Sequence, residues 1–107
     1  MLVISGCAST VTDVKSTAPM VYKSNQNPKL AANCIVKNID DNYGKFMPFL
    51  QEGTTQDNYM IRVRSGEAGN AALVEIEPIE NGSLITTQIS NHYPFKKMLM
   101  GIFTNGC

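Results

Sequence analysis

Residues 58–90 read NYMIRVRSGEAGNAALVEIEPIENGSLITTQIS, and this stretch decides the fold. Between residues 58 and 64 every second side chain is apolar: Tyr59, Ile61 and Val63. The alternation recurs in residues 71–79 and 83–90, as expected of strands with one buried and one solvent-facing side. Asn81-Gly82, between the last two segments, is a strong signal for a tight hairpin turn. The stretch therefore predicts three consecutive antiparallel strands.

A helix is predicted on each side of these strands. Asn27 as N-cap and Pro28 at the first helical position favour a helix start, and residues 40–44 end that helix. Its apolar residues recur at helical spacing: Leu30, Ala31, Cys34, Ile35 and Ile39. A second helix is expected after Tyr93-Pro94, with an apolar stripe of Phe95, Met98, Leu99, Ile102 and Phe103.

The order α–β–β–β–α indicates an α+β fold. We expect a three- or four-stranded antiparallel meander with both helices packed on one face of the sheet. The fourth strand is left open, because residues 46–50 are apolar but interrupted by Pro48, which suits either an edge segment or a loop. At 107 residues the chain has room for one domain, predicted to span residues 21–107.

The charge balance argues against nucleic acid as a partner. Nine basic residues stand against nine acidic ones, so the composition shows no electrostatic footprint for nucleic acid or for an anionic membrane. No stretch of the sequence is long and apolar enough to span a bilayer as a helix.

The first residues resemble a processing signal. Ile4-Ser5-Gly6-Cys7 resembles the lipobox of bacterial lipoproteins, in which a branched apolar residue and two small residues precede a cysteine. The resemblance implies a diacylglycerol on the Cys7 sulfur, cleavage just before it, and a membrane anchor. Ala8 after the cysteine is similar to the pattern of lipoproteins sent to the outer membrane.

Residues 1–6 are then the remnant of a signal peptide, and residues 7–20 a lipidated flexible tether. Residues 8–20 are rich in Ser, Thr, Ala and Pro, without a periodic apolar pattern. A complete signal peptide has a basic start and a longer apolar region, whereas only six residues precede Cys7 and none is basic. Either the chain starts at a downstream codon or its first residues are missing. The alternative to lipidation is a free Cys7 in a frayed tail.

The other two cysteines are expected to form a disulfide. Cys34 lies on the apolar stripe of the first helix and Cys107 just beyond the second, so helices packed side by side would bring them together. Such a bond stabilises a chain by about 4 kcal/mol for a loop of roughly seventy residues. It also agrees with an oxidising periplasm. Two unlinked thiols are the alternative.

The chain is also similar to a loosely defined group of short proteobacterial lipoproteins. Three features carry this resemblance: Val21-Tyr22-Lys23-Ser24, Ala31-Ala32-Asn33-Cys34-Ile35 and the final Cys107. The resemblance implies a similar fold, but no particular biochemical activity.

The sequence gives only weak support for a catalytic or metal site. His92 is the only histidine, and no nucleophile motif accompanies it, so a surface or capping role is favoured. Asp40, Asn42 and Gly44 resemble the start of a calcium loop, but Gln51 stands where its bidentate glutamate belongs. Two distant cysteines and one histidine do not make a zinc site. We therefore predict no catalytic residue, metal or cofactor.

Polar strand faces offer a docking surface instead. Glu75, Glu77 and Glu80 lie on the solvated side of one predicted strand, and Arg62 and Arg64 on that of its neighbour, where cross-strand pairs can form. We name four possible partner-binding residues: Tyr43, Phe46, Arg62 and Arg64.

The leading hypothesis is a non-enzymatic envelope lipoprotein, anchored at the outer membrane through Cys7, with its domain in the periplasm or at the cell surface. It would bind another envelope protein as a structural or accessory component. A tethered inhibitor or exclusion factor, acting on a lysozyme or a receptor through the loop of residues 43–58, is the alternative. An enzymatic interpretation rests only on His92 and the strand glutamates.

Overall fold

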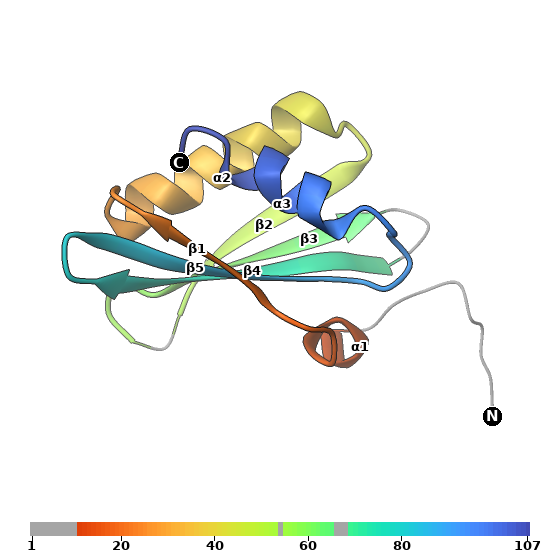
Figure 1. Ribbon diagram of the computed structural model, residues 1–107, viewed down its shortest axis with the longest axis horizontal. Helices are drawn as coiled ribbons and strands as arrows, with labels where there is room; N and C mark the ends of the chain where they lie inside the picture. Colours follow the sequence, from red (N-terminus) through yellow and green to blue (C-terminus); the bar gives the residue numbers. More distant parts are fainter. Residues whose placement is uncertain (1–10, 54, 66–68) are drawn as a thin grey trace.

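The structure is a computed structural model that describes residues 11–53, 55–65 and 69–107. The described part contains one antiparallel sheet of five strands together with three helices (Figure 1). The predicted α+β class is therefore correct, but the sheet has five strands where three or four were expected. Cys7 and residues 1–6, the predicted remnant of a signal peptide, lie outside the described residues.

The sheet has the strand order β1-β5-β4-β3-β2. Four strands follow one another as a meander: β2 (Phe46–Glu52), β3 (Tyr59–Ser65), β4 (Gly69–Ile79) and β5 (Gly82–Ile89). The fifth, β1 (Met20–Ser24), pairs with β5 at the opposite edge from β2. Residues 46–52 are thus an edge strand, a position that tolerates Pro48 because its missing N–H removes no bond from the sheet interior.

Helix α2 (Pro28–Asn42) connects these two edges. Its start is as predicted: the Asn27 side-chain oxygen accepts a hydrogen bond from the Leu30 backbone N–H at 2.9 Å. Its buried residues are Pro28, Ala31, Ala32, Ile35 and Ile39. Leu30 is 56% exposed, so its place in the predicted stripe is wrong. Each residue turns the helix by about 100°, which carries Leu30 away from a stripe centred near Ala31 and Ile35.

Helix α3 (Lys96–Thr104) also differs from its predicted stripe. Leu99, Met100, Phe103 and Thr104 are its buried residues. Phe95 and Met98, expected in the core, are 66% and 56% exposed. The reason is that Phe95 precedes the helix, and the buried side is rotated toward Met100.

The main hydrophobic core joins α2 and α3 to the alternating residues of the sheet. Ile35, Ile39 and Phe103 belong to one cluster with inward-facing strand residues, among them Ile61, Val63, Val74, Ile76, Ile85 and Ile89. The predicted strand faces are therefore correct.

Residues 11–20 do not form the expected structureless tether. Val11–Lys15 form the short helix α1, which packs on β4 and β5, and Figure 1 shows it on the other side of the sheet from α2 and α3. Val14 is fully buried, and the Gln88 side chain donates hydrogen bonds to the Lys15 and Thr17 carbonyls at 2.8 and 2.9 Å. A helix of five residues is too short to show a periodicity that the sequence could reveal.

Candidate functional site

The side of the sheet that carries α1 is only partly covered. Helix α1 packs on β4 and β5, whereas β2 and β3 lie beyond it. Because Ile61 and Val63 face the main core, the alternating residues of β3 point to the opposite side. We call the following five residues the β2–β3 outer face: Met47, Phe49, Met60, Arg62 and Arg64.

Two exposed apolar side chains of β2 lie beside two arginines of β3. The antiparallel register places Met47 opposite Arg64 and Phe49 opposite Arg62. Met47 is 46% exposed and Phe49 is 51% exposed. Neither residue stands out in the sequence, because residues 46–50 are all apolar and show no alternation.

Arg62 is half-buried and Arg64 is exposed. The Nε of Arg62 is buried and has no hydrogen-bond partner within the described part of the chain. In the register of β3 and β4, Leu73 lies opposite Arg62 and Met60 lies opposite Glu75. The arginines and glutamates are therefore not direct cross-strand neighbours, contrary to the pairing considered from the sequence. Arg64 is the more exposed of the two arginines and can reach a partner.

Tyr43 and Phe46 lie elsewhere, on the side of the main core. The Tyr43 ring is 5.2 Å from that of Phe46 and 6.1 Å from that of Phe103, centroid to centroid. Phe46 in turn meets Tyr93 edge-on at 5.6 Å. Both residues are half-buried and pack against the core cluster. The four predicted partner-binding residues therefore form two separate pairs: Tyr43 with Phe46 on the core side, and Arg62 with Arg64 on the opposite face.

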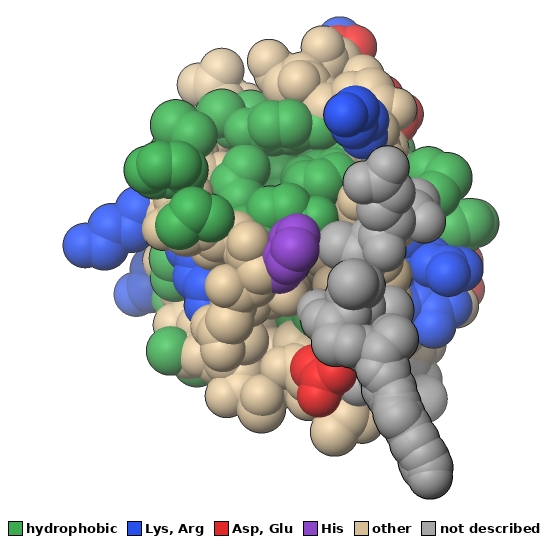
Figure 2. All heavy atoms as spheres, turned by 90° about the vertical axis from the view of Figure 1, so that its right-hand side faces the viewer, with side chains coloured by type: hydrophobic (Ala, Val, Ile, Leu, Met, Phe, Trp, Pro, Cys, Tyr) green, Lys and Arg blue, Asp and Glu red, His purple; other side chains and the backbone are tan. Residues whose placement is uncertain are grey.

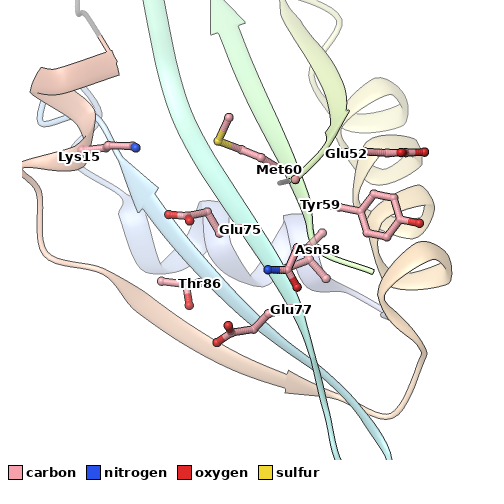
Figure 3. A pocket seen from close by; sticks show the side chains of 10 residues that line it. Lys15, Glu52, Asn58, Tyr59, Met60, Glu75, Glu77 and Thr86 are labelled. Atoms are coloured by element: carbon pink, nitrogen blue, oxygen red, sulfur yellow. The ribbon is translucent and has the colours of Figure 1, made fainter. Parts of the chain in front are cut away.

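A shallow groove of about 470 Å³ adjoins the β2–β3 outer face. It is lined by residues that include Lys15, Met60, Glu75, Glu77 and Thr86. Figure 3 shows Lys15, from α1, and Glu75, from β4, on the same side of the sheet, with Glu52, Asn58 and Tyr59 at the far end of the groove. The groove is open, its lining is about as apolar as it is polar, and its charged side chains are one lysine and three glutamates.

The residues considered for chemistry are not brought together. His92 is exposed, does not line the groove, and has its ring 5.3 Å from that of its neighbour Tyr93. Asn42 closes α2, and its side-chain nitrogen donates to the Asn38 carbonyl at 2.9 Å, an arrangement of a helix end. Among the described residues no group of three His, Cys, Asp or Glu side chains is arranged to hold a metal ion.

One exposed ion pair lies on α2. Lys37 Nζ and Asp41 Oδ2 are 2.8 Å apart, one helical turn from each other. The hydrogen bond from Lys37 to Asp41, together with the charge of that carboxylate, raises the pKa of Lys37. Such a surface pair contributes little to stability.

The two remaining cysteines lie close together. Cys34, on α2, and Cys107, after α3, form a disulfide with their Cα atoms 5.8 Å apart. Beside it, the Asn38 side chain donates to the carbonyl oxygens of Phe103 and Asn105 at 3.0 and 2.9 Å. The Cys34–Cys107 disulfide links α2 to the segment that follows α3.

Comparison of the chain with protein-family models, with curated proteins and with solved structures gives no match. In the described ranges, the helices are too short or too polar to cross a bilayer.

Proposed function

We propose that this chain is a membrane-anchored, non-enzymatic lipoprotein of the bacterial outer membrane whose domain binds another envelope protein through the β2–β3 outer face. The anchor would be the lipid on Cys7, for which the Ile4–Cys7 stretch is the support. In this arrangement α2 and α3 both cover one face of the sheet and leave the other to α1 and the partner.

The observation that carries the protein-binding role is the composition of the outer face. Phe49 and Met47 are about half exposed on neighbouring positions of one strand face, with Arg62 and Arg64 directly opposite. Aromatic residues, Met and Arg are the types enriched at protein interfaces, and Arg is common among the residues that dominate binding energy. Such a combination indicates an interface better than an apolar patch alone.

The arginines define the chemistry of the partner. A guanidinium is planar and forms paired hydrogen bonds with a carboxylate, so Arg62 and Arg64 favour an acidic segment. Arg62 is held in place because it is half-buried between Phe49 of β2 and Leu73 of β4 in the register. We expect the partner to present an apolar residue to Phe49 and a carboxylate to Arg62.

Cross-linking in intact cells tests the protein-binding role. The full-length chain with Cys7 intact should give a cross-linked envelope protein that Phe49→Ser removes. Val21→Ser is the matched control, because Val21 is 59% exposed on the same face of the sheet but at the opposite edge, in β1. Equal cross-linking by wild type and Phe49→Ser would show that this face is not the interface.

The anchor has its own test. Intact mass of the protein purified from membranes after expression with a complete signal peptide should show a diacylglyceryl or triacyl adduct on a chain beginning at Cys7. Cys7→Ser should move the protein from the membrane fraction to the soluble fraction. An unmodified Cys7 would end the lipoprotein proposal, whatever the cross-linking shows.

A tethered inhibitor is the competing proposal, and one local feature favours it. Strand β2 (Phe46–Glu52) occupies part of the loop expected over residues 43–58, and the residues just before Asn58 form a turn. There Asp57 has a φ of 63°, and the Gly53 N–H donates to the Asn58 carbonyl at 2.7 Å. If the purified chain inhibits a lysozyme and Asp57→Ala abolishes the inhibition, this turn, and not the outer face, is the working surface.

A further inference from the structure

A second exposed apolar surface lies at the end of the molecule where α3 begins. Phe95 is 66% exposed and Met98 56%, the former one residue before the helix and the latter in its first turn. Figure 2 looks at this end and shows apolar side chains gathered in one patch, with the single histidine, His92, at its margin. We call Tyr93, Phe95 and Met98 the α3 end patch.

The α3 end patch rests on packed aromatic rings. Tyr93 meets Phe46 edge-on at 5.6 Å, and Phe46 is 5.2 Å from Tyr43, which reaches the buried Phe103. Because Leu99, Met100 and Phe103 already fill the buried side of α3, Phe95 and Met98 are left to project outward. Phe95 and Met98 therefore lie next to packed aromatic rings but are not part of the core.

Lysines accompany this patch. Lys96 and Lys97 occupy the first turn of α3, which has no acidic residue, and Lys45 directly precedes Phe46. Lys97 and Lys45 are exposed, while Lys96 Nζ donates to Asn91 Oδ1 at 2.5 Å. Cations at a helix start are opposed by the helix dipole, and α3 has no side-chain cap there. The lysines therefore do not serve the stability of the helix.

We propose that the α3 end patch contacts the surface of an anionic phospholipid bilayer. Phe95 and Met98 would enter the boundary between headgroups and acyl chains, while Lys45, Lys96 and Lys97 would face the headgroup phosphates. Exposed aromatic and apolar side chains next to lysines are the composition of interfacial membrane contacts.

The α3 end patch and the β2–β3 outer face differ in the cationic residues beside them. That face carries arginines, which suit the planar carboxylates of a protein, whereas the α3 end patch carries lysines. Lysine is a compact charge on a flexible apolar stem that can lie along an apolar layer with its ammonium in water. The inference goes beyond the proposed protein-binding role and does not depend on the lipid at Cys7.

Vesicle binding by the full-length Cys7→Ser chain tests the proposal, because this variant has no acylation site. We expect it to sediment with vesicles of phosphatidylcholine mixed with phosphatidylglycerol, less with phosphatidylcholine alone, and less at high salt. Phe95→Ser with Met98→Ser should lower the partition coefficient by about tenfold or more. Lys96→Gln with Lys97→Gln should lower it about tenfold for the anionic vesicles only.

Leu30→Ser is the matched control. Leu30 is 56% exposed on α2, but it lies beside Asn81 and Gly82 of the β4–β5 turn, away from the α3 end patch. Since the chain contains no tryptophan, Phe95→Trp adds a single fluorophore to the Cys7→Ser chain. Its emission should shift to the blue on addition of anionic vesicles and be quenched by brominated lipid, whereas that of Leu30→Trp should not change.

Three results would overturn the proposal: no sedimentation with anionic vesicles, equal binding by the Phe95→Ser/Met98→Ser variant, or an unshifted emission of Phe95→Trp. If the same double substitution instead removes a cross-linked protein in cells while vesicles bind nothing, the patch serves a protein. None of these results bears on the cross-linking test of Phe49→Ser or on the intact mass of the chain that begins at Cys7. The three proposals can therefore fail independently of one another.

Discussion

The hydroxyl of Ser24, at the end of β1, donates a hydrogen bond to the backbone carbonyl oxygen of Cys107, although these residues lie near opposite ends of the chain. The same hydroxyl accepts a hydrogen bond from the Gln26 backbone N–H at 3.0 Å. Ser24 is buried. Its side chain therefore links the last residue of β1 both to the residues that precede α2 and to the segment after α3.

Ser24→Ala should therefore lower the free energy of unfolding by about 1–3 kcal/mol, because it leaves buried backbone groups without their partner. Urea denaturation followed by circular dichroism measures this change. Ser16→Ala is the control, since the Ser16 hydroxyl bonds the Asp13 carbonyl at an exposed position and should matter little. Equal effects at the two positions would contradict the role assigned to Ser24.

Reduction of the Cys34–Cys107 disulfide should lower the stability of the domain by about 4 kcal/mol in the chain-entropy model. The bond closes a loop with a sequence separation of 73 residues, which is why the expected effect is large. Thermal unfolding with and without reductant, and of Cys34→Ser with Cys107→Ser, measures it. Superimposable melting curves before and after reduction would mean that the bond does not constrain the unfolded chain.

Gly82→Ala should destabilise the sheet by more than about 1 kcal/mol. A Cβ built at Gly82 would lie 1.9 Å from the Ser24 carbonyl oxygen, which belongs to the paired strand β1. The strands must then separate locally. Gly101→Ala is the matched control: a Cβ there meets nothing within 4 Å, and alanine inside α3 should stabilise by about 0.5–1 kcal/mol. Shifts of the same sign in both variants would refute the close approach.

Val14→Ala should lower the free energy of unfolding by about 1–2 kcal/mol, because it removes two buried methyl groups. Val14, in α1, is fully buried, whereas a residue of a flexible tether would contribute nothing to stability. Thr12→Ala, in the same helix but exposed, should be neutral. The midpoints of denaturant unfolding distinguish a packed helix α1 from a flexible tether. An unchanged midpoint for Val14→Ala would support the flexible tether.

The meander strands were predictable because their signal is local. Ile61 with Val63, and Val74 with Ile76, alternate within single strands, and Asn81-Gly82 forms the turn before β5. Strand β1 was missed because its pairing is supplied by β5, far away in the sequence, and its own side chains are mostly exposed. The burial of Val14 likewise depends on β4 and β5 and not on its neighbours in sequence.

The candidate site was predictable in part for the same reason. The alternation of β3 placed Arg62 and Arg64 on the solvent side, and the structure puts them there. Tyr43 and Phe46 were selected as aromatic residues of an expected loop, but aromatic character does not say which side of the sheet a ring will pack on. Phe49 was missed because Pro48 left open whether its segment is a strand at all.

The strand order also bears on when the sheet can form during synthesis. Residues 20–24 emerge early, yet they pair only with residues 83–87 of β5. Until β5 has been made, β1 has no neighbour and the meander lacks its last strand. The segment that becomes β1 must therefore stay unpaired until β5 has emerged, which requires about four-fifths of the sequence. Synthesis of β5, more than the formation of any one hairpin, should set the moment at which this sheet closes.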